Sequence, residues 1–124
     1  MAKVILAEDD SMTVEIYRKK FEDAGFEIIV ASTGKEVLRC AEKEKADLIL
    51  LDLVLPEMGG LDVLKELKKS GKHNAKLKII VFSNLDSDED KTKAFRRGAD
   101  GFISKTKHTP SELVEEIKKI LENN

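Results

Sequence analysis

The sequence is poor in residues that cross-link a chain or anchor it in a membrane. Of 124 residues, one is cysteine, two are proline and none is tryptophan. The single cysteine, Cys40, cannot form an internal disulfide or a cysteine-based zinc site. Apolar runs such as Leu48–Leu51 are far too short to cross a bilayer, and the start MAKVILAEDD lacks the apolar core of a signal peptide. The sequence therefore favours a cytoplasmic protein without disulfides.

An excess of charge of one sign is also missing. Lysine and arginine number 22 against 24 acidic residues, which gives a net charge of −2. This balance provides no overall basic field of the kind that attracts nucleic acid or anionic lipid. Hydrophobic residues make up 41% of the chain, enough to form a core. No linker or repeat interrupts the chain, so we expect one domain over residues 1–124.

Five short runs rich in Val, Ile, Leu and Phe are typical of strands. They are Val4–Ala7, Glu27–Ala31, Asp47–Leu51, Leu77–Phe82 and Gly101–Ser104. The third and fourth are apolar on both faces, as in central parallel strands covered by helices on both sides. After each run, apolar residues recur at helical spacing. This order predicts an α/β fold with five strands and five helices in a doubly wound parallel sheet.

Several helix ends are marked by capping residues. Asp10 or Ser11 can cap the first helix, and for Asp10 a cap is favoured over a role as ligand. The segments T33-G-K-E36 and T109-P-S-E112 match the capping box. The fourth helix is expected to begin near Ser87.

Polar side chains gather where the strands end. They are Glu8, Asp9 and Asp10 after the first strand, Asp52 after the third, Ser83 after the fourth and Lys105 after the fifth. Ligands of doubly wound sheets bind at these carboxyl ends. Neighbouring carboxylates repel each other unless a cation is present, and Mg²⁺ suits oxygen ligands of this kind. With a hydroxyl and an ammonium nearby, the group is suited to a phosphoryl ligand.

Each of these residues also has an ordinary structural explanation. Glu8 or Asp9 alone could be a solvated strand end, and Ser83 or Lys105 alone means little. Asp52 is harder to dismiss, because a charge directly after a fully apolar run is costly unless it is paired or exposed. Their joint placement at four strand ends carries the inference.

Four motifs, VILAEDD, LILLDLVLPEMGGLDVL, IIVFSN and GADGFISK, resemble response-regulator receiver domains of two-component signalling. The resemblance covers essentially the whole chain. Within this family, the chain resembles the single-domain chemotaxis regulators. It implies a flavodoxin-like five-stranded sheet of order 2-1-3-4-5 with five helices. It also implies a phosphorylation-activated switch in a phosphorelay, with at most self-catalysed phosphoryl transfer and dephosphorylation rather than enzyme activity on other substrates.

The resemblance assigns a role to individual residues. Asp52 would accept a phosphoryl group from a histidine kinase or phosphotransfer protein, and Asp9 and Asp52 would ligate Mg²⁺ directly. Glu8 would contact the ion mostly through a bound water, and the Val54 carbonyl would complete the protein ligands of the ion.

The remaining assignments concern the response to phosphorylation. Ser83 would bond a phosphoryl oxygen, Lys105 would pair with the phosphoryl group, and Phe102 would occupy the aromatic switch position. The affected surface would be the fourth helix, fifth strand and fifth helix, where the resemblance suggests contacts with a downstream protein or in a weak homodimer.

The chain departs from the family pattern at three places. Lys105 precedes Thr106 where the family has Lys-Pro, Phe102 replaces a frequent tyrosine, and Gly59 replaces a frequent acid. A cis bond before a residue other than proline costs about 3 kcal/mol, so we expect a trans Lys105–Thr106 peptide.

Other classes fit less well. A haloacid-dehalogenase-type hydrolase needs a second acid two residues after its nucleophile, where this chain has Val54. A nucleotide or flavin binder would have glycines in its first loop, which here reads E-D-D-S-M. Direct DNA binding would need an appended helix-turn-helix. A receiver-like protein-interaction module that works without phosphorylation stays open as the alternative.

Overall fold

Five parallel strands form a single sheet in the computed structural model, which describes residues 1–123. The strands are β1 (Lys3–Ala7), β2 (Glu27–Ala31), β3 (Leu48–Leu51), β4 (Lys78–Ser83) and β5 (Gly101–Ser104). Their order in the sheet is β2-β1-β3-β4-β5. The predicted fold class and strand order are confirmed, with strand ends displaced by at most one residue.

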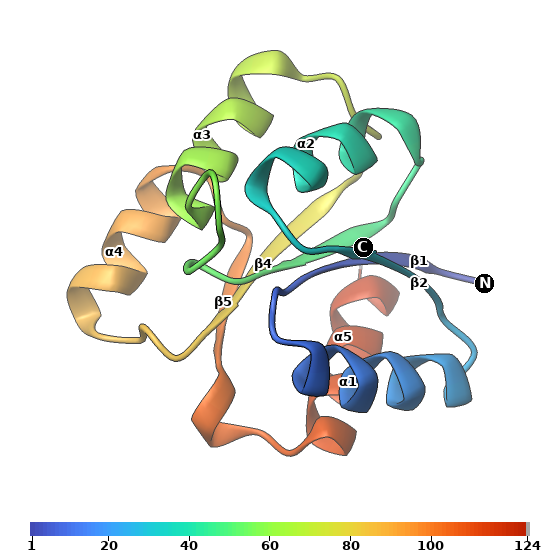
Figure 1. Cartoon of the computed structure of the whole chain (residues 1–124). Coiled ribbons are helices and arrows are strands. Elements are labelled where there is room, and N and C mark those ends of the chain that lie inside the picture. The colour runs from blue at the N-terminus through green and yellow to red at the C-terminus, as the bar shows by residue number, and fades with distance from the viewer. Residues whose placement is uncertain (124) are drawn as a thin grey trace.

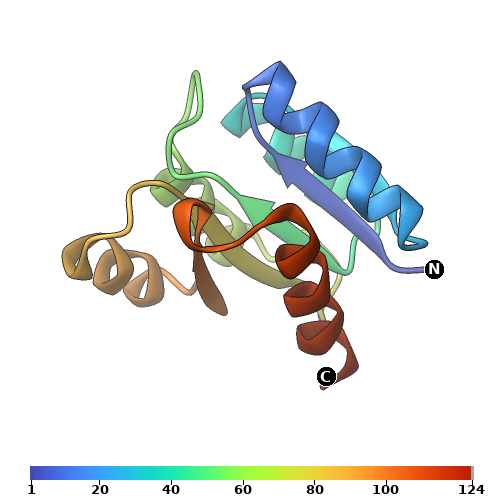
Figure 2. The same ribbon diagram turned by 90° about the horizontal axis from the view of Figure 1, so that it is seen from below.

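Five helices cover the two faces of the sheet. They are α1 (Ser11–Asp23), α2 (Gly34–Lys43), α3 (Gly60–Ser70), α4 (Asp88–Arg96) and α5 (Pro110–Glu122). Helices α1 and α5 lie on one face, and α2, α3 and α4 lie on the other (Figure 1). Seen from below, α1 and α5 are on the viewer's side of the sheet (Figure 2). Among the residues described, none of these helices has the length and hydropathy to traverse a bilayer.

The alternation of side chains along the strands produces two hydrophobic cores. In β1, Val4 and Leu6 belong to the core beneath α1 and α5, whereas Ile5 and Ala7 belong to the core beneath α2 to α4. All four residues of β3 are buried, as expected for a strand covered on both faces. Polar groups can therefore gather only at the strand ends.

The helix caps mostly follow the sequence prediction. Asp10 caps α1, because its carboxylate accepts the N–H of Thr13 at 3.0 Å. Thr109 and Glu112 form the predicted capping box of α5, and Ser87 with Asp90 forms another at α4.

The box predicted at α2 is wrong in one half. The Thr33 hydroxyl accepts the N–H of Glu36 at 3.1 Å as expected, but the Glu36 carboxylate accepts from the backbone N–H of Ser32 at 3.0 Å. Ser32 also directs its hydroxyl to the same carboxylate oxygen. Two donors on Ser32 therefore replace the single backbone donor of Thr33.

Gly34 brings two loops together next to the strand ends. Its N–H donates to the carbonyl of Pro56 at 3.2 Å, which joins the loop before α2 to the loop after β3. A Cβ at position 34 would lie 2.1 Å from the Met58 carbonyl oxygen. The loop that follows Asp52 can approach this closely only because residue 34 has no side chain.

We therefore expect Gly34→Ala to destabilise the protein by about 2 kcal/mol through overpacking against backbone. The measurement is urea unfolding followed by circular dichroism. Gly59→Ser is the matched control, because the nearest atom to a Cβ there is the Leu53 carbonyl oxygen at 3.6 Å, and the hydroxyl can cap α3. Equal stability of Gly34→Ala and the unsubstituted protein would show that the two loops separate without cost.

Candidate functional site

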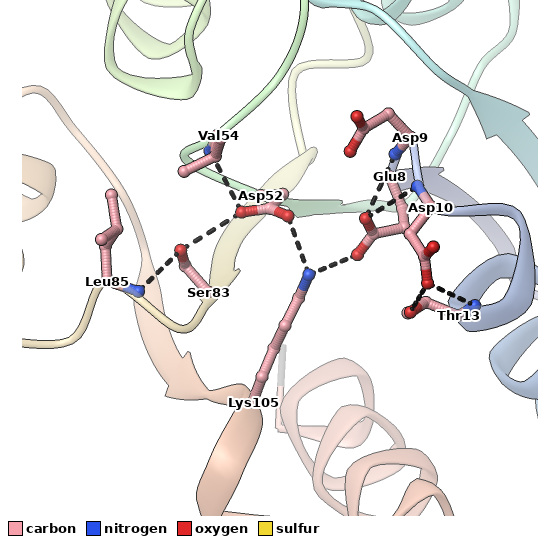
Figure 3. Close-up of polar contacts among 9 residues, drawn as sticks. All are labelled: Glu8, Asp9, Asp10, Thr13, Asp52, Val54, Ser83, Leu85 and Lys105. Atoms are coloured by element: carbon pink, nitrogen blue, oxygen red, sulfur yellow. Dashed lines mark hydrogen bonds and ion pairs between the residues drawn. The ribbon is translucent and has the colours of Figure 1, made fainter.

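The predicted site residues converge at the carboxyl ends of the strands. Glu8 and Asp9 directly follow β1, Asp52 follows β3, Ser83 ends β4, and Lys105 follows β5 as the first residue of a 3-10 helix, η1 (Lys105–Lys107). The structure brings Glu8, Asp52, Ser83 and Lys105 into one connected set of polar contacts (Figure 3). The short helix η1 was not predicted from the sequence.

Lys105 lies between two buried carboxylates. Its Nζ donates to Asp52 Oδ2 at 2.7 Å and to Glu8 Oε1. Glu8 is only 3% exposed and Asp52 only 7% exposed. Two unpaired carboxylates so deeply buried would be very costly, and the ammonium offsets one of their two negative charges through contacts with both. The Lys105–Thr106 peptide is trans, as expected.

The surroundings of Lys105 keep it protonated. Partial burial alone would lower the pKa of its ammonium, but hydrogen bonds and charge interactions with Asp52 and Glu8 outweigh that effect. The pKa of Lys105 is therefore raised above its ordinary value. A cation is thus held permanently beside Asp52 at physiological pH.

Asp52 has hydrogen-bond donors on its other oxygen too. The Ser83 hydroxyl donates to Oδ1 at 3.2 Å, and the Val54 N–H donates to the same oxygen at 3.1 Å. The Ser83 oxygen in turn accepts the N–H of Leu85 at 3.1 Å. Ser83 therefore connects the carboxylate directly to the backbone of the loop before α4.

Asp9 completes the acidic group from the exposed side. One carboxylate oxygen each of Glu8, Asp9 and Asp52 lies within 4.8 Å of the others. The carboxylate of Asp9 is exposed and points away from Lys105 (Figure 3). Glu8 is fixed by the backbone N–H groups of Asp9 and Asp10, each 3.2 Å from its Oε2. These three residues offer the hard oxygen donors that could bind a metal ion such as Mg²⁺.

Asp10 does not join this group, in agreement with its predicted role as a helix cap. Its carboxylate bonds to the side chain and backbone of Thr13, and these bonds lower its pKa. The acid pair at the site is therefore Glu8 and Asp9.

Phe102 lies in β5, three residues before Lys105. It is half-buried in β5, in register with Val81 of β4, and packs against the core beneath α2 to α4. The ammonium of Lys91 in α4 lies 5.9 Å from the centre of its ring. The ring is thus in contact range of both the sheet and α4, near the end of the strand that carries Ser83.

Sequence reasoning missed the backbone donors of the site. The N–H groups of Val54 and Leu85 contribute hydrogen bonds that do not depend on the identity of their side chains. No residue type could have revealed them. The joint pairing of Lys105 with Glu8 as well as Asp52 was also not anticipated.

The doubly wound sheet and this crevice define an α/β domain built around a buried aspartate. Comparison with known families identifies it further, since the model of the response regulator receiver domain matches residues 4–118. The chain belongs to this family. Receiver domains of two-component response regulators are signalling phosphoacceptors rather than classical enzymes, which defines the general role of this chain.

Curated relatives agree with this assignment. The chain is 33% identical to the alkaline phosphatase synthesis transcriptional regulatory protein PhoP of Bacillus subtilis, over 96% of this chain and 48% of that protein. It is 32% identical to the polar-differentiation response regulator DivK of Brucella anthropi, over 95% of this chain and 94% of that protein. The chain thus spans about half the length of the Bacillus relative but nearly all of DivK.

Solved structures agree on the fold. The Francisella response regulator 1452 receiver domain superposes with a TM-score of 0.88 at 29% identity, covering 99% of this chain and 98% of that chain. The chemotaxis protein CheY4 of Vibrio cholerae gives a TM-score of 0.86 at 27% identity, covering 97% and 98%.

Proposed function

We propose that this chain is a phosphorylation-activated switch in a two-component phosphorelay, with Asp52 as the phosphoacceptor. The observation that carries the proposal is the position of Asp52, which is 7% exposed between Lys105 at 2.7 Å and Ser83 at 3.2 Å. An ammonium and a hydroxyl on opposite oxygens of one carboxylate can stabilise the oxygens of a phosphoryl group on that residue. We take the donor to be a histidine kinase or phosphotransfer protein, and the setting to be the cytoplasm.

Phosphoryl transfer to Asp52 would proceed without a protein acid. One carboxylate oxygen of Asp52 forms a bond to phosphorus while the bond between phosphorus and the donor's imidazole nitrogen breaks, and the electron pair leaves with that nitrogen. A proton already on the other ring nitrogen of the donor makes neutral imidazole the leaving group. The Lys105 ammonium already lies beside the Asp52 carboxylate, so it can stabilise the negative charge that the phosphoryl group adds. Loss of the phosphoryl group would follow by attack of water on phosphorus, which restores the carboxylate.

The acidic group fits Mg²⁺ as the resident cofactor. Glu8, Asp9 and Asp52 supply carboxylate oxygens, the hard donors that this ion prefers. The backbone carbonyl of Val54 would complete the protein ligands. When bound, Mg²⁺ would neutralise charge on the transferring oxygens. Asp9, exposed beside the buried pair, would be the residue that holds the ion directly together with Asp52.

The response would begin at Ser83. Its hydroxyl donates to Asp52, and its oxygen accepts the N–H of Leu85. A phosphoryl group on Asp52 that attracts the Ser83 hydroxyl would therefore also move the loop before α4. Space vacated near Ser83 can be filled by the Phe102 ring, which has no hydroxyl and therefore acts through packing alone. The surface altered would be α4, β5 and α5, which we propose as the contact for a downstream protein or a weak homodimer.

The proposal is tested by the intact mass after incubation with Mg²⁺ and acetyl phosphate. We expect the gain of one phosphoryl group, absent in Asp52→Asn because the nucleophilic oxygen is lost. Asp23→Asn, at the exposed end of α1, is the matched control and should gain the group normally. A mass gain that persists in Asp52→Asn would contradict the assignment. No gain in the unsubstituted protein would favour an interaction module that works without phosphorylation.

The metal ligands are tested by calorimetric titration with Mg²⁺. Asp9→Ala should weaken Mg²⁺ binding by about tenfold or more, because it removes a direct ligand. Loss of a residue that only supports a metal ligand already costs about this much affinity. Lys105→Ala should bind Mg²⁺ at least as tightly as the unsubstituted protein, because its ammonium competes for Asp52 and Glu8. Unchanged affinity in Asp9→Ala would remove that residue from the site, and collapse of affinity in Lys105→Ala would make the lysine structural.

The role of Ser83 is tested by NMR with a beryllofluoride mimic of the phosphoryl group. Ser83→Ala should still accept the group on Asp52, but the chemical-shift changes of the Phe102 ring should fall to about half or less, since the hydroxyl contact that favours the active state is gone. Ser70→Ala, at the exposed C-terminal end of α3, is the control. Changes of full size around Phe102 in Ser83→Ala would show that the coupling follows another route.

A further inference from the structure

Positive charge is concentrated in one short segment of this acidic chain. Residues 65–78 contain six lysines and one glutamate, a net charge of +5. The other 110 residues hold 16 basic and 23 acidic side chains, a net charge of −7. The segment covers the second half of α3 and the approach to β4. We call its lysines the basic patch: Lys65, Lys68, Lys69, Lys72, Lys76 and Lys78.

The lysines of the basic patch are not engaged in ion pairs. The spacing of Lys65, Lys68 and Lys69 is i, i+3 and i+4, which places them on one side of α3. Lys72 follows Gly71, the left-handed residue that ends the helix, and lines a neighbouring hollow with Glu42 and Glu66. Lys76 and Lys78 extend the patch beyond the helix to the start of β4. Within residues 1–123, none of the six forms an ion pair with a carboxylate.

A hollow lies where the helix and strand parts of the patch meet. It measures about 420 Å³ and is lined by Lys68, Lys76 and Lys78 together with Ala75, Leu77 and Asp100. Asp100 is the one carboxylate among these lining residues, and it accepts the N–H of Ile79 at 2.8 Å. Three lysines face this one acid, so the hollow has an excess of positive charge.

The stem of Lys68 is held in place at this hollow. A Cβ at Gly98 would lie 2.6 Å from Lys68 Cε, so the lysine stem lies directly against the glycine. Gly98 has a φ of 102°, which also favours glycine there. A lysine packed on backbone loses less side-chain entropy when it binds an anion than one that is free in solvent.

We propose that the basic patch is a docking surface for an acidic segment of a partner protein, rich in glutamate and aspartate. Lysines near the C-terminus of α3 also interact favourably with the helix dipole. That interaction does not explain Lys76 and Lys78, which lie outside the helix. A group of cations around a hollow suits a peptide with several carboxylates. The surface is separate from Asp52, so this inference does not depend on the proposed function.

The same observations argue against a nucleic acid as the occupant. The patch contains no arginine, so it offers no bidentate contact to bases. The aromatic ring within residues 65–78, that of His73, is half-buried with its nitrogens at the carbonyl oxygens of Asn74 and Leu67, which makes it a poor platform for stacking. Exposed acids, among them Asp9, Asp10, Glu57 and Asp88, surround the opposite end of the strands. They would repel a long polyanion, whereas a short peptide contacts the patch alone.

The test uses fluorescein-labelled hexaglutamate as the probe and hexaglutamine as the uncharged control peptide. Binding is followed by fluorescence anisotropy without Mg²⁺, first at low salt and then at about 150 mM salt, where screening should weaken it. Amide NMR shifts upon addition of hexaglutamate should map to residues 65–78. The protein variants are Lys68→Gln/Lys72→Gln/Lys76→Gln and the matched control Lys35→Gln/Lys43→Gln/Lys119→Gln, which changes three exposed lysines elsewhere.

We expect about tenfold weaker hexaglutamate binding in the patch variant and less than about twofold weakening in the control. Circular dichroism melting confirms that both variants are folded. Equal weakening in both variants, or shifts away from residues 65–78, would overturn the proposal by showing a response to net charge alone. Failure of hexaglutamate to bind would overturn it as well. Tighter binding of a short DNA duplex than of hexaglutamate would replace the acidic peptide with nucleic acid as the occupant.

Discussion

The structure depends on one arrangement of charge, the Lys105 ammonium between the buried carboxylates of Glu8 and Asp52. The parallel sheet places the ends of β1 and β3 side by side, so two acids that are 44 residues apart in sequence become neighbours in space. Without a cation they would repel each other in a poorly solvated crevice. Lys105 comes from the far end of the chain, so the site is complete only when β1, β3, β4 and β5 lie together in the sheet.

Much of the fold could be predicted, because burial leaves a strong pattern in the sequence. The fully apolar runs that end in Leu51 and Phe82 indicate central strands, and their order along the chain allows few topologies. The side chains of the site were predictable for the same reason. A charged residue such as Asp52 directly after a buried strand must lie beyond the carboxyl end of that strand, and parallel strands bring such residues together.

Other parts of the site could not be predicted, because they depend on backbone positions. The donors to Asp52 and Ser83 include the N–H groups of Val54 and Leu85, which any residue except proline would supply. The Glu36 carboxylate bonds to Ser32 rather than to Thr33, because Ser32 offers both its N–H and its hydroxyl to the same oxygen. The meeting of Gly34 with Pro56 depends on tertiary packing between two loops, and neither residue alone indicates it.

The separation of opposite charges has a consequence for the electric field around the molecule. Helix α3 has eleven residues and leads from the acidic end of the sheet to the basic patch, a distance of about 16 Å at 1.5 Å per residue. At physiological ionic strength the Debye length is about 8 Å. Counterions therefore screen each end from the other, and an approaching molecule experiences one local field instead of an average close to neutrality. A chain with a net charge of only −2 can thus attract cations at one end and anions at the other at the same time.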